Sequence, residues 1–319
     1  MSDALTEASR RIIEVTQSEF TKLARLFAPS IARAIDEFGD EWRLDFGELL
    51  AKRYADADGR ADAIRGYAAF AIDSMRRQQR FEVTRAYPAK TYAEAAAEVY
   101  FNDTYMESQY LPGLLLSHYL WPHHYQQLRY FKRFFAPMIA ASESARFAEV
   151  GVGTGIYSRT ALQLASAATG VGYDISPVSA RFAAHHVDTF GLGSRYRVEL
   201  RDIIKTPPDE PFDQVLCVEV LEHLEDPLAL LVGLRAMTKQ GGRLFVTAAL
   251  NAANADHIYL YRTPQEVLAQ VEAAGLHVEH FFFANAYAPP RAGVPVPGAI
   301  AVVARPVSTV ASAAPTGSR

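Results

Sequence analysis

A glycine-rich turn constrains the fold of this 319-residue chain more than any other feature. The run from Phe147 to Val152 is mostly apolar, which predicts a buried strand, and residues 156–168 repeat apolar side chains at helical spacing. Glycines at positions 151, 153 and 155 therefore occupy a strand-to-helix turn. Such a turn brings the backbone close to a ligand, and free amides at the helix start can bind it. The sequence predicts an α/β fold with a nucleotide or nucleoside site at this turn.

The spacing of these glycines separates two kinds of site. A dinucleotide site follows the pattern G-x-G-x-x-G, but Ile156 stands where its third glycine would be, one residue after Gly155. Glu149 would also repel a pyrophosphate, whereas it can accept a hydrogen bond from an ammonium group. The pattern therefore favours a nucleoside ligand, and it weakens NAD-dependent hydride transfer as a function.

The same segment fits the pattern acid-x-Gly-x-Gly-x-Gly at every position, with Glu149, Gly151, Gly153 and Gly155. In this it resembles the first motif of the class I S-adenosylmethionine-dependent methyltransferases. The resemblance covers roughly residues 140–304 and implies a Rossmann-like, seven-stranded, mostly parallel sheet with flanking helices. It also implies S-adenosyl-L-methionine as the cofactor, with Glu149 facing the amino group of its methionine part.

Further candidate cofactor-binding residues follow the next strands. Asp174 ends the second predicted strand, about twenty residues after the glycines, where an acid of a nucleotide-binding unit accepts hydrogen bonds from ribose hydroxyls. The resemblance gives Asp174 the same role, assigns the adenine amino group to Asp202 and places Ile203 on the adenine ring. Ile175 and Glu219, at the ends of the second and fourth strands, complete the predicted set. A surface turn is the alternative for Asp202.

Residues 221–227 resemble the fourth motif of the same family. They follow the apolar strand predicted for residues 211–220, so they lie at the carboxyl edge of the sheet, where ligands bind in open α/β folds. His223 is a candidate general base there, because a histidine pKa near about 6.5 is easily adjusted around neutrality. The alternative is that Glu222 and His223 form a structural or orienting pair.

Aromatic residues and histidines are concentrated between residues 99 and 125. Their rings can hold a sulfonium by cation–π attraction worth about 0.5–2 kcal/mol. Resemblance to methyltransferases with an N-terminal helical extension implies that this segment closes over the cofactor, and Tyr105 is its candidate catalytic residue. The alternative is that these side chains only attach the helices to the sheet. We assign no metal, because His123 and His124 are adjacent on a helix and lack partners at ligand spacing.

A polar and aromatic loop, residues 250–261, follows the fifth predicted strand at the carboxyl edge of the sheet. Loops in that position often carry substrate contacts. We therefore expect His257 to be a catalytic candidate, with Asn254 and Tyr259 as further site residues. The alternative for His257 is a residue that only leads into the next helix.

Three regions are predicted along the chain. Residues 1–140 form an all-helical lid or accessory region, in which Pro29, Gly39, Gly47 and Gly59 divide several helices. Residues 141–305 form the catalytic domain, and residues 306–319, rich in small residues, form a disordered tail. The alternative is a helical region that only covers the catalytic domain or forms a homodimer.

Bulk composition excludes several classes of function. A formal charge of −4 with 50% hydrophobic residues suggests neither disorder nor binding to nucleic acid. The first residues lack the layout of a secretory signal and no apolar run is long enough to span a membrane, so we expect a cytoplasmic protein that binds no membrane. Cys217 lies in an apolar run, which predicts a buried, inert thiol.

Taken together, the motifs predict a methyltransferase that acts on an O, N or C atom of a small-molecule metabolite. An alternative keeps the cofactor and changes the reaction: the cofactor's own amine or carboxylate attacks another sulfonium carbon. Formation of azetidine-2-carboxylate with release of methylthioadenosine is one such outcome. A non-catalytic binder of the cofactor is a third hypothesis.

Overall fold

A seven-stranded sheet forms the centre of the computed structural model, which describes residues 3–142, 145–291 and 293–307. The strands lie in the order β3-β2-β1-β4-β5-β7-β6, and β7 is antiparallel to both of its neighbours while the other pairs are parallel. Their bounds are β1 Arg146–Val150, β2 Thr169–Asp174, β3 Tyr196–Leu200, β4 Phe212–Cys217, β5 Thr238–Leu250, β6 Leu276–Asn285 and β7 Gly298–Pro306. The predicted mostly parallel α/β sheet is confirmed.

The two central strands β1 and β4 are apolar because their residues are buried on both faces of the sheet. Four consecutive residues of β1 and the last four of β4 are fully covered, as expected for central parallel strands. Strand β4 ends at Cys217, three residues before the predicted end at Val220. The reason lies at Glu219, whose φ is 51° and whose amide donates to the Thr247 hydroxyl at 2.9 Å, so the chain leaves the ladder there. Cys217 is buried, as predicted.

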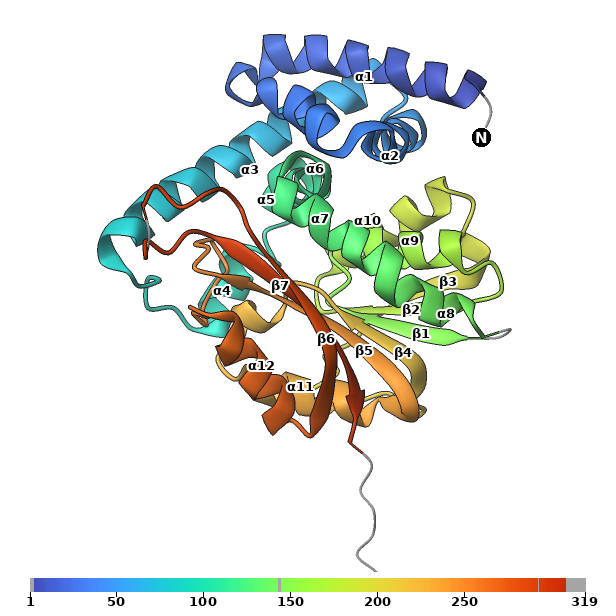
Figure 1. Ribbon diagram of the computed structural model, residues 1–319, viewed down its shortest axis with the longest axis vertical. Helices are drawn as coiled ribbons and strands as arrows, with labels where there is room; N and C mark the ends of the chain where they lie inside the picture. The colour runs from blue at the N-terminus through green and yellow to red at the C-terminus, as the bar shows by residue number, and fades with distance from the viewer. Residues whose placement is uncertain (1–2, 143–144, 292, 308–319) are drawn as a thin grey trace, which may run out of the picture.

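Helices cover both faces of the sheet (Figure 1). Helices α11 and α12 lie on one face, and α8, α9 and α10 lie on the other. Their bounds are α8 Ala136–Ala140, α9 Ile156–Leu164, α10 Pro177–Thr189, α11 Pro227–Ala236 and α12 Pro264–Ala273. Ser176 caps α10 by accepting the Ser179 amide, as its position before a proline suggests.

The N-terminal part consists of helices and the loops that join them, without a strand among its described residues, which confirms the predicted class of structure. It contains α1 Asp3–Leu23, α2 Pro29–Arg53, α3 Ala57–Thr84, α4 Tyr92–Glu98, α5 Asp103–Tyr105, α6 Leu111–Leu120 and α7 Pro122–Tyr130. Two wide π-helical turns, Met106–Tyr110 and Phe131–Phe135, join α5 to α6 and α7 to α8. No helix of the described residues is long and apolar enough to cross a membrane.

Two of the four predicted helix breaks are wrong. Pro29 begins α2, and Gly39 kinks that helix with a φ of 63°. Gly47, however, lies inside α2, where a Cβ would come within 2.5 Å of Ser9 Cβ, so this glycine permits close packing against α1. Gly59 lies in the first turn of α3, where Asp56 accepts its amide at 2.6 Å. Packing and capping, which a local pattern does not show, override the helix-breaking tendency of glycine.

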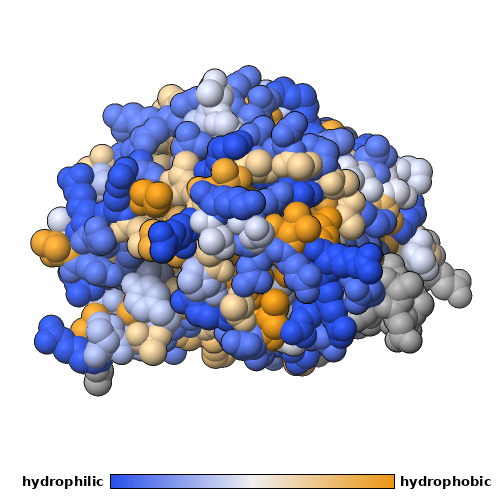
Figure 2. All heavy atoms as spheres, turned by 90° about the horizontal axis from the view of Figure 1, so that it is seen from above, coloured by the Kyte–Doolittle hydropathy of each residue, from blue (hydrophilic) through white to orange (hydrophobic). Residues whose placement is uncertain are grey.

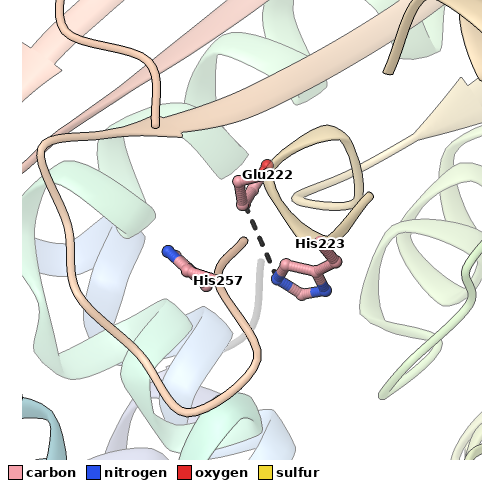
Figure 3. A group of neighbouring side chains, drawn as sticks. All are labelled: Glu222, His223 and His257. Atoms are coloured by element: carbon pink, nitrogen blue, oxygen red, sulfur yellow. Dashed lines mark ion pairs between the residues drawn. The ribbon is translucent and has the colours of Figure 1, made fainter. Parts of the chain in front are cut away.

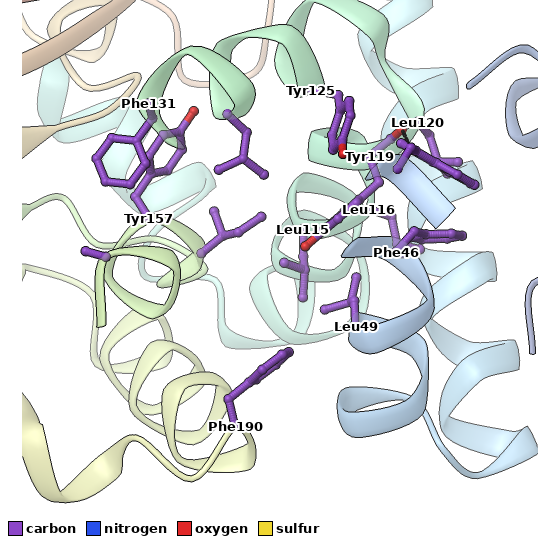
Figure 4. Packing of buried hydrophobic residues seen from close by; sticks show 14 of the residues in the cluster. Phe46, Leu49, Leu115, Leu116, Tyr119, Leu120, Tyr125, Phe131, Tyr157 and Phe190 are labelled. Atoms are coloured by element: carbon purple, nitrogen blue, oxygen red, sulfur yellow. Dashed lines mark hydrogen bonds between the residues drawn. The ribbon is translucent and has the colours of Figure 1, made fainter. Parts of the chain in front are cut away.

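An apolar cluster joins the N-terminal helices to the sheet (Figure 4). Phe46 of α2 and Tyr119 of α6 pack at one end of it, while Phe131 and Tyr157 lie against Phe245 of β5 at the other. The two parts on either side of residues 140–141 therefore share one core, and the domain boundary drawn there stays a prediction. On the outer face, over α1 and α2, hydrophilic side chains predominate and apolar ones are interspersed (Figure 2).

The first two residues of the predicted tail belong to the fold. Pro306 is the last residue of β7, and the Val307 amide donates to the Gly275 carbonyl at 3.0 Å. The remainder of the predicted tail, residues 308–319, lies outside the described residues.

Close packing at Gly66 gives a test of how α3 is fixed. A Cβ at this position would lie 2.3 Å from the carbonyl oxygen of Ser108, in the first π-helical turn. We expect Gly66→Ala to lower the free energy of unfolding by about 1–3 kcal/mol, because helix and turn must move apart. Urea denaturation measures this change in the free energy of unfolding.

The matched control is Gly233→Ala in α11, where the added Cβ meets only Ile203 Cδ1 at 3.4 Å. We expect this change to be neutral or to stabilise by about 0.5–1 kcal/mol, since alanine favours a helix interior. Equal effects of the two substitutions would contradict the proposed close contact.

Candidate functional site

A cavity of about 840 Å³ lies between the carboxyl ends of the central strands and the N-terminal helices. The glycine turn and Asp174 line it on the sheet side. Tyr67, Trp121 and His123 line it on the helical side. This volume lies within the range of about 300–1,000 Å³ that is usual for small-molecule sites.

The glycine turn has the backbone geometry that the sequence predicted. Gly151, Gly153 and Gly155 have φ values of 70°, 47° and 71°, a region that favours glycine. A Cβ on Gly151 would also lie 2.5 Å from Val220 Cγ2. Gly153 lines the cavity, and a Cβ there would project toward Leu114 at 3.7 Å. The turn therefore leaves room beside its backbone for a bound nucleoside.

Asp174 lies at the end of β2, directly beside this turn. Its carboxylate accepts the Gly153 amide at 3.2 Å and the Ser176 amide at 2.8 Å, and it lines the cavity. Burial raises the pKa of Asp174 to about 6, although these amides act in the opposite direction. The adjacent Ile175 also lines the cavity.

Glu149 is only 2% exposed and points toward the start of α9. Its Oε2 accepts the Ser158 amide at 2.9 Å and the Ser158 hydroxyl, which leaves Oε1 for another donor. Burial raises the pKa of Glu149 to about 7, against the two bonds from Ser158. Part of the carboxylate that was expected to face the cofactor's amino group is therefore used to hold the helix that follows.

Asp202 and Ile203 follow β3 and line the same cavity. Asp202 accepts the backbone amides of Ile204 and Lys205 at 3.1 and 3.3 Å, and Lys205 Nζ lies 2.9 Å from its second oxygen. Burial acts to raise the pKa of Asp202, but Lys205 and the amides outweigh it, so the pKa is lowered. Ile203 is 4% exposed and presents an apolar surface.

Two glutamates lie just beyond β4. Glu219 accepts a hydrogen bond from the Thr247 hydroxyl at 2.6 Å, and Gln127 Nε2 lies 3.5 Å from the same oxygen. Glu222 is fully buried, and neither of its carboxylate oxygens has a hydrogen-bond partner among the described residues. Burial, and then the charge of Glu219, raise the pKa of Glu222. From the sequence, Glu222 was expected only as a structural or orienting partner of His223.

His223 takes part in a buried hydrogen-bond chain. Tyr100 and Tyr110 donate their hydroxyls to Asp256 Oδ2 at 3.0 and 2.7 Å, and Tyr100 also lies 2.7 Å from His223 Nδ1. Since the Tyr100 proton goes to Asp256, His223 donates Nδ1–H to Tyr100 and keeps a lone pair on Nε2. Burial lowers the pKa of His223, partly offset by Asp256. His223 is therefore a neutral imidazole near pH 7.

His257 lies across from His223, with ring centroids 5.0 Å apart (Figure 3). Its Nδ1 lies 2.7 Å from the Ala252 carbonyl and must donate to it, so Nε2 is again free of a proton. Burial, and then the neighbouring His223, lower the pKa of His257 to about 4. The backbone carbonyl of Glu222 accepts the Ile258 and Tyr259 amides at 2.8 and 2.9 Å, which ties the two loops together.

Asn254 and Tyr259, two further predicted site residues, differ in their position relative to the cavity. Asn254 lines the cavity and accepts the Ser74 hydroxyl at 2.8 Å. Tyr259 is not among the residues that line the cavity, and its hydroxyl accepts Gln270 Nε2 at 2.8 Å.

Tyr105 also lies outside the cavity lining, with its ring centroid 6.0 Å from that of Tyr110. Tyr92, Tyr100 and Tyr110 line the cavity in its place. The catalytic role expected of Tyr105 therefore stays a prediction, and its side chain does not line the cavity.

The histidine pair at the start of α7 lies on the helical wall of the cavity. His118, His123 and His124 all line it, and burial lowers the pKa of His123 to about 3. The Ser117 hydroxyl lies 3.1 Å from His124 Nδ1. These imidazoles are therefore neutral, and they form a polar but uncharged wall.

Comparison with known proteins places the similarity on the sheet. Residues 148–244 match the family model described as a methyltransferase domain. The ubiquinone biosynthesis O-methyltransferase of Xylella fastidiosa strain 9a5c is 31% identical over 155 residues, which covers 42% of this chain and 62% of that protein. That of Parvibaculum lavamentivorans is 33% identical over 117 residues, covering 37% and 45%. The chain thus spans less than two-thirds of the length of these relatives.

Among solved structures, the mitomycin 7-O-methyltransferase MmcR resembles the chain with a TM-score of 0.51 and 19% identity. The match covers 77% of this chain and 71% of that one. At this identity the similarity concerns the fold.

The raised pKa of Glu149 predicts a pH dependence of stability. The folded protein holds this proton up to about pH 7, well above the ordinary value of 4.5, so the group favours folding at low pH. This contribution is lost as the pH rises through 7. Only the wild type loses this contribution. We therefore expect the unfolding free energy of Glu149→Gln, measured relative to that of the wild type, to rise by about 1–3 kcal/mol as the pH increases from 5 to 8.

Urea titrations at several pH values measure this difference. The exposed Glu272→Gln serves as the control and should show a constant difference from the wild type. If the unfolding free energies of Glu149→Gln and the wild type change in parallel with pH, burial does not raise the pKa of this carboxyl group.

Proposed function

We propose that this chain, in which residues 148–244 match a methyltransferase domain, transfers a methyl group from S-adenosylmethionine to a small molecule bound in the same cavity. The observation that carries this proposal is the continuity of the cavity. It runs from Gly153 and Asp174 at the strand ends to Tyr67 and Trp121 in the helical part. A single enclosed space can therefore hold a donor and an acceptor side by side.

The donor end fits the cofactor residue by residue. When bound, S-adenosylmethionine supplies a methyl group on a positively charged sulfur and leaves as neutral S-adenosylhomocysteine. We assign the ribose hydroxyls to Asp174, and the adenine to Asp202 and Ile203. The free oxygen of Glu149 accepts a hydrogen bond from the amino group. Glu219 and Ile175 complete the wall of this end of the cavity.

The acceptor end is formed by loops that the N-terminal helices hold in place. Tyr87 of the helical part donates to the Ala252 carbonyl at 2.5 Å, and Lys90 donates to the Ala255 carbonyl at 2.8 Å. The helices therefore act as a cover that excludes water from the reacting atoms. His223 presents its Nε2 lone pair here, and we propose that it acts on the acceptor's hydroxyl. The O-methyltransferase names of the curated relatives support an oxygen acceptor.

Replacing Asp174 tests the donor end directly. We expect Asp174→Asn to weaken S-adenosylhomocysteine binding about tenfold or more, because an amide accepts hydrogen bonds from ribose hydroxyls less strongly than a carboxylate does. Isothermal titration calorimetry measures the affinity, and the exposed Asp209→Asn should bind as the wild type does. Unchanged affinity in Asp174→Asn would place the ribose elsewhere.

A second candidate reaction uses the same cofactor without an acceptor. Glu149 lines the cavity, has one free oxygen, and has a pKa of about 7. Such a group is suited to take a proton from the cofactor's own ammonium, after which the amine can displace methylthioadenosine and close a ring. Azetidine-2-carboxylate is the product expected from attack on the sulfonium-bound γ-carbon.

Incubation with S-adenosylmethionine alone separates the two reactions. Methyl transfer predicts that the cofactor stays intact until an acceptor such as a small phenol is added, after which S-adenosylhomocysteine appears. Cyclisation predicts methylthioadenosine without any acceptor, and a binder without activity yields neither product. Liquid chromatography with mass spectrometry distinguishes these compounds, and heat-denatured protein corrects for spontaneous cofactor breakdown.

A further inference from the structure

Three side chains at the acceptor end of the cavity converge from two loops. Glu222 and His223 lie in the 3₁₀ turn Leu221–His223 after β4, and His257 lies in the loop after β5. One ligand atom from each lies within 4.8 Å of those of the other two. Figure 3 shows His223 Nε2 directed toward Glu222, and the two atoms that form this pair, Nε2 and Oε1, are 3.9 Å apart.

Both imidazoles are held in the form that binds a metal ion. His257 donates Nδ1–H to the Ala252 carbonyl, and His223 donates Nδ1–H to Tyr100, whose own proton goes to Asp256. Each ring therefore keeps its Nε2 lone pair. A bond from the second nitrogen to a carbonyl or to a carboxylate-linked group is the usual support of a metal-ligating histidine.

The carboxylate of Glu222 lacks the partners that burial normally requires. Its side chain is 0% exposed, yet neither oxygen accepts a hydrogen bond within the described part of the chain. A buried carboxyl group without a partner is costly, and Glu219 nearby adds a second acid. Neighbouring tyrosine hydroxyls go to Asp256 instead, at 2.7 and 3.0 Å. A cation between Glu222 and the two imidazoles would give the carboxylate a partner and would bind the free Nε2 lone pairs.

We propose that Glu222, His223 and His257 bind a divalent first-row transition-metal ion, such as Zn²⁺, Co²⁺ or Mn²⁺. Two imidazole nitrogens and one carboxylate are typical ligands for these ions, whereas Mg²⁺ and Ca²⁺ prefer oxygen ligands alone. Three protein ligands leave a coordination position open, which is the arrangement of catalytic rather than structural sites. Because all three residues line the cavity, the open position faces the space for the acceptor.

This inference rests on the proposed methyl transfer and specifies its acceptor. An acceptor hydroxyl in the open position would lose its proton more readily, because the ion stabilises the oxygen anion. That oxygen then forms the bond to the methyl carbon as the carbon–sulfur bond breaks, and the released proton goes to solvent. The site therefore selects an acceptor with a hydroxyl group able to reach the ion. With the ion bound, His223 acts on that hydroxyl through the ion and not as a base, because its Nε2 is then a ligand.

Metal binding can be measured without any turnover. Untagged protein is stripped with a chelator, returned to metal-free buffer and titrated with Co²⁺, while visible absorption and elemental analysis report the bound metal. We expect one equivalent to bind, with d–d absorption typical of nitrogen and oxygen ligands. His257→Gln and Glu222→Gln should each weaken binding about tenfold or more.

His123→Gln is the matched control, since His123 is also a buried histidine that lines the cavity but lies outside the three residues. It should bind Co²⁺ as the wild type does. Circular dichroism confirms that each variant folds. Because two ligand positions are replaced separately, the test still holds if one variant does not fold. The proposal is overturned if the wild type does not bind Co²⁺, or if both ligand variants bind Co²⁺ as tightly as the wild type does.

A separate titration of the metal-free protein with S-adenosylhomocysteine keeps the two proposals apart. Cofactor binding without metal binding supports methyl transfer and rejects the metal site. Metal binding without cofactor binding rejects the proposed function and leaves the metal site with no acceptor assigned.

Discussion

The apolar contact between the N-terminal helices and the sheet is the interaction on which the site depends. Phe131 and Tyr157 pack against Phe245 on the sheet, and Trp42 donates its indole N–H to the Tyr119 carbonyl at 2.7 Å. This contact holds the helical part against the sheet, and Tyr67 and Trp121 of that part lie across the cavity from the carboxyl ends of the strands. The acids and imidazoles at the strand ends are thereby removed from water, and their altered pKa values follow from that enclosure.

Enclosure acts differently on neighbouring acids. Burial acts to raise the pKa of Asp256, but the pKa is lowered, first by the neighbouring His223 and His257 and then by the hydroxyls of Tyr110 and Tyr100. Burial, and then the charge of Glu219, raise the pKa of Glu222. The helical part supplies both tyrosines, so it contributes to this difference between the two carboxyl groups. The part of the chain that covers the cavity therefore also alters the pKa of a group inside it.

Much of the sheet follows from local sequence. Strand β2 ends at Asp174 as predicted, and Gly151 has a positive φ at the turn. These features depend on short apolar runs and on residue types that few conformations accept. Gly47 was misread as a helix break because its reason is contact with Ser9 of α1, which no nearby residue reveals.

The site was only partly predictable for the same reason. Asp174 and Asp202 follow strands whose order fixes their positions, and they line the cavity as expected. The meeting of Glu222 with His257 depends on two loops joined through backbone bonds from Ile258 and Tyr259 to the Glu222 carbonyl. Such a contact between distant segments leaves no periodic signal in the chain.

The π-helical turn at Met106–Tyr110 has a consequence for how this fold can vary. A wide turn holds one residue more than an ordinary helical turn, and one residue corresponds to a rotation of about 100°. Deleting a single residue there would keep a helix but turn Tyr110 away from Asp256. Close homologues that have lost that residue should therefore lack the hydrogen bond from Tyr110 to Asp256 while preserving every motif of the nucleoside-binding half.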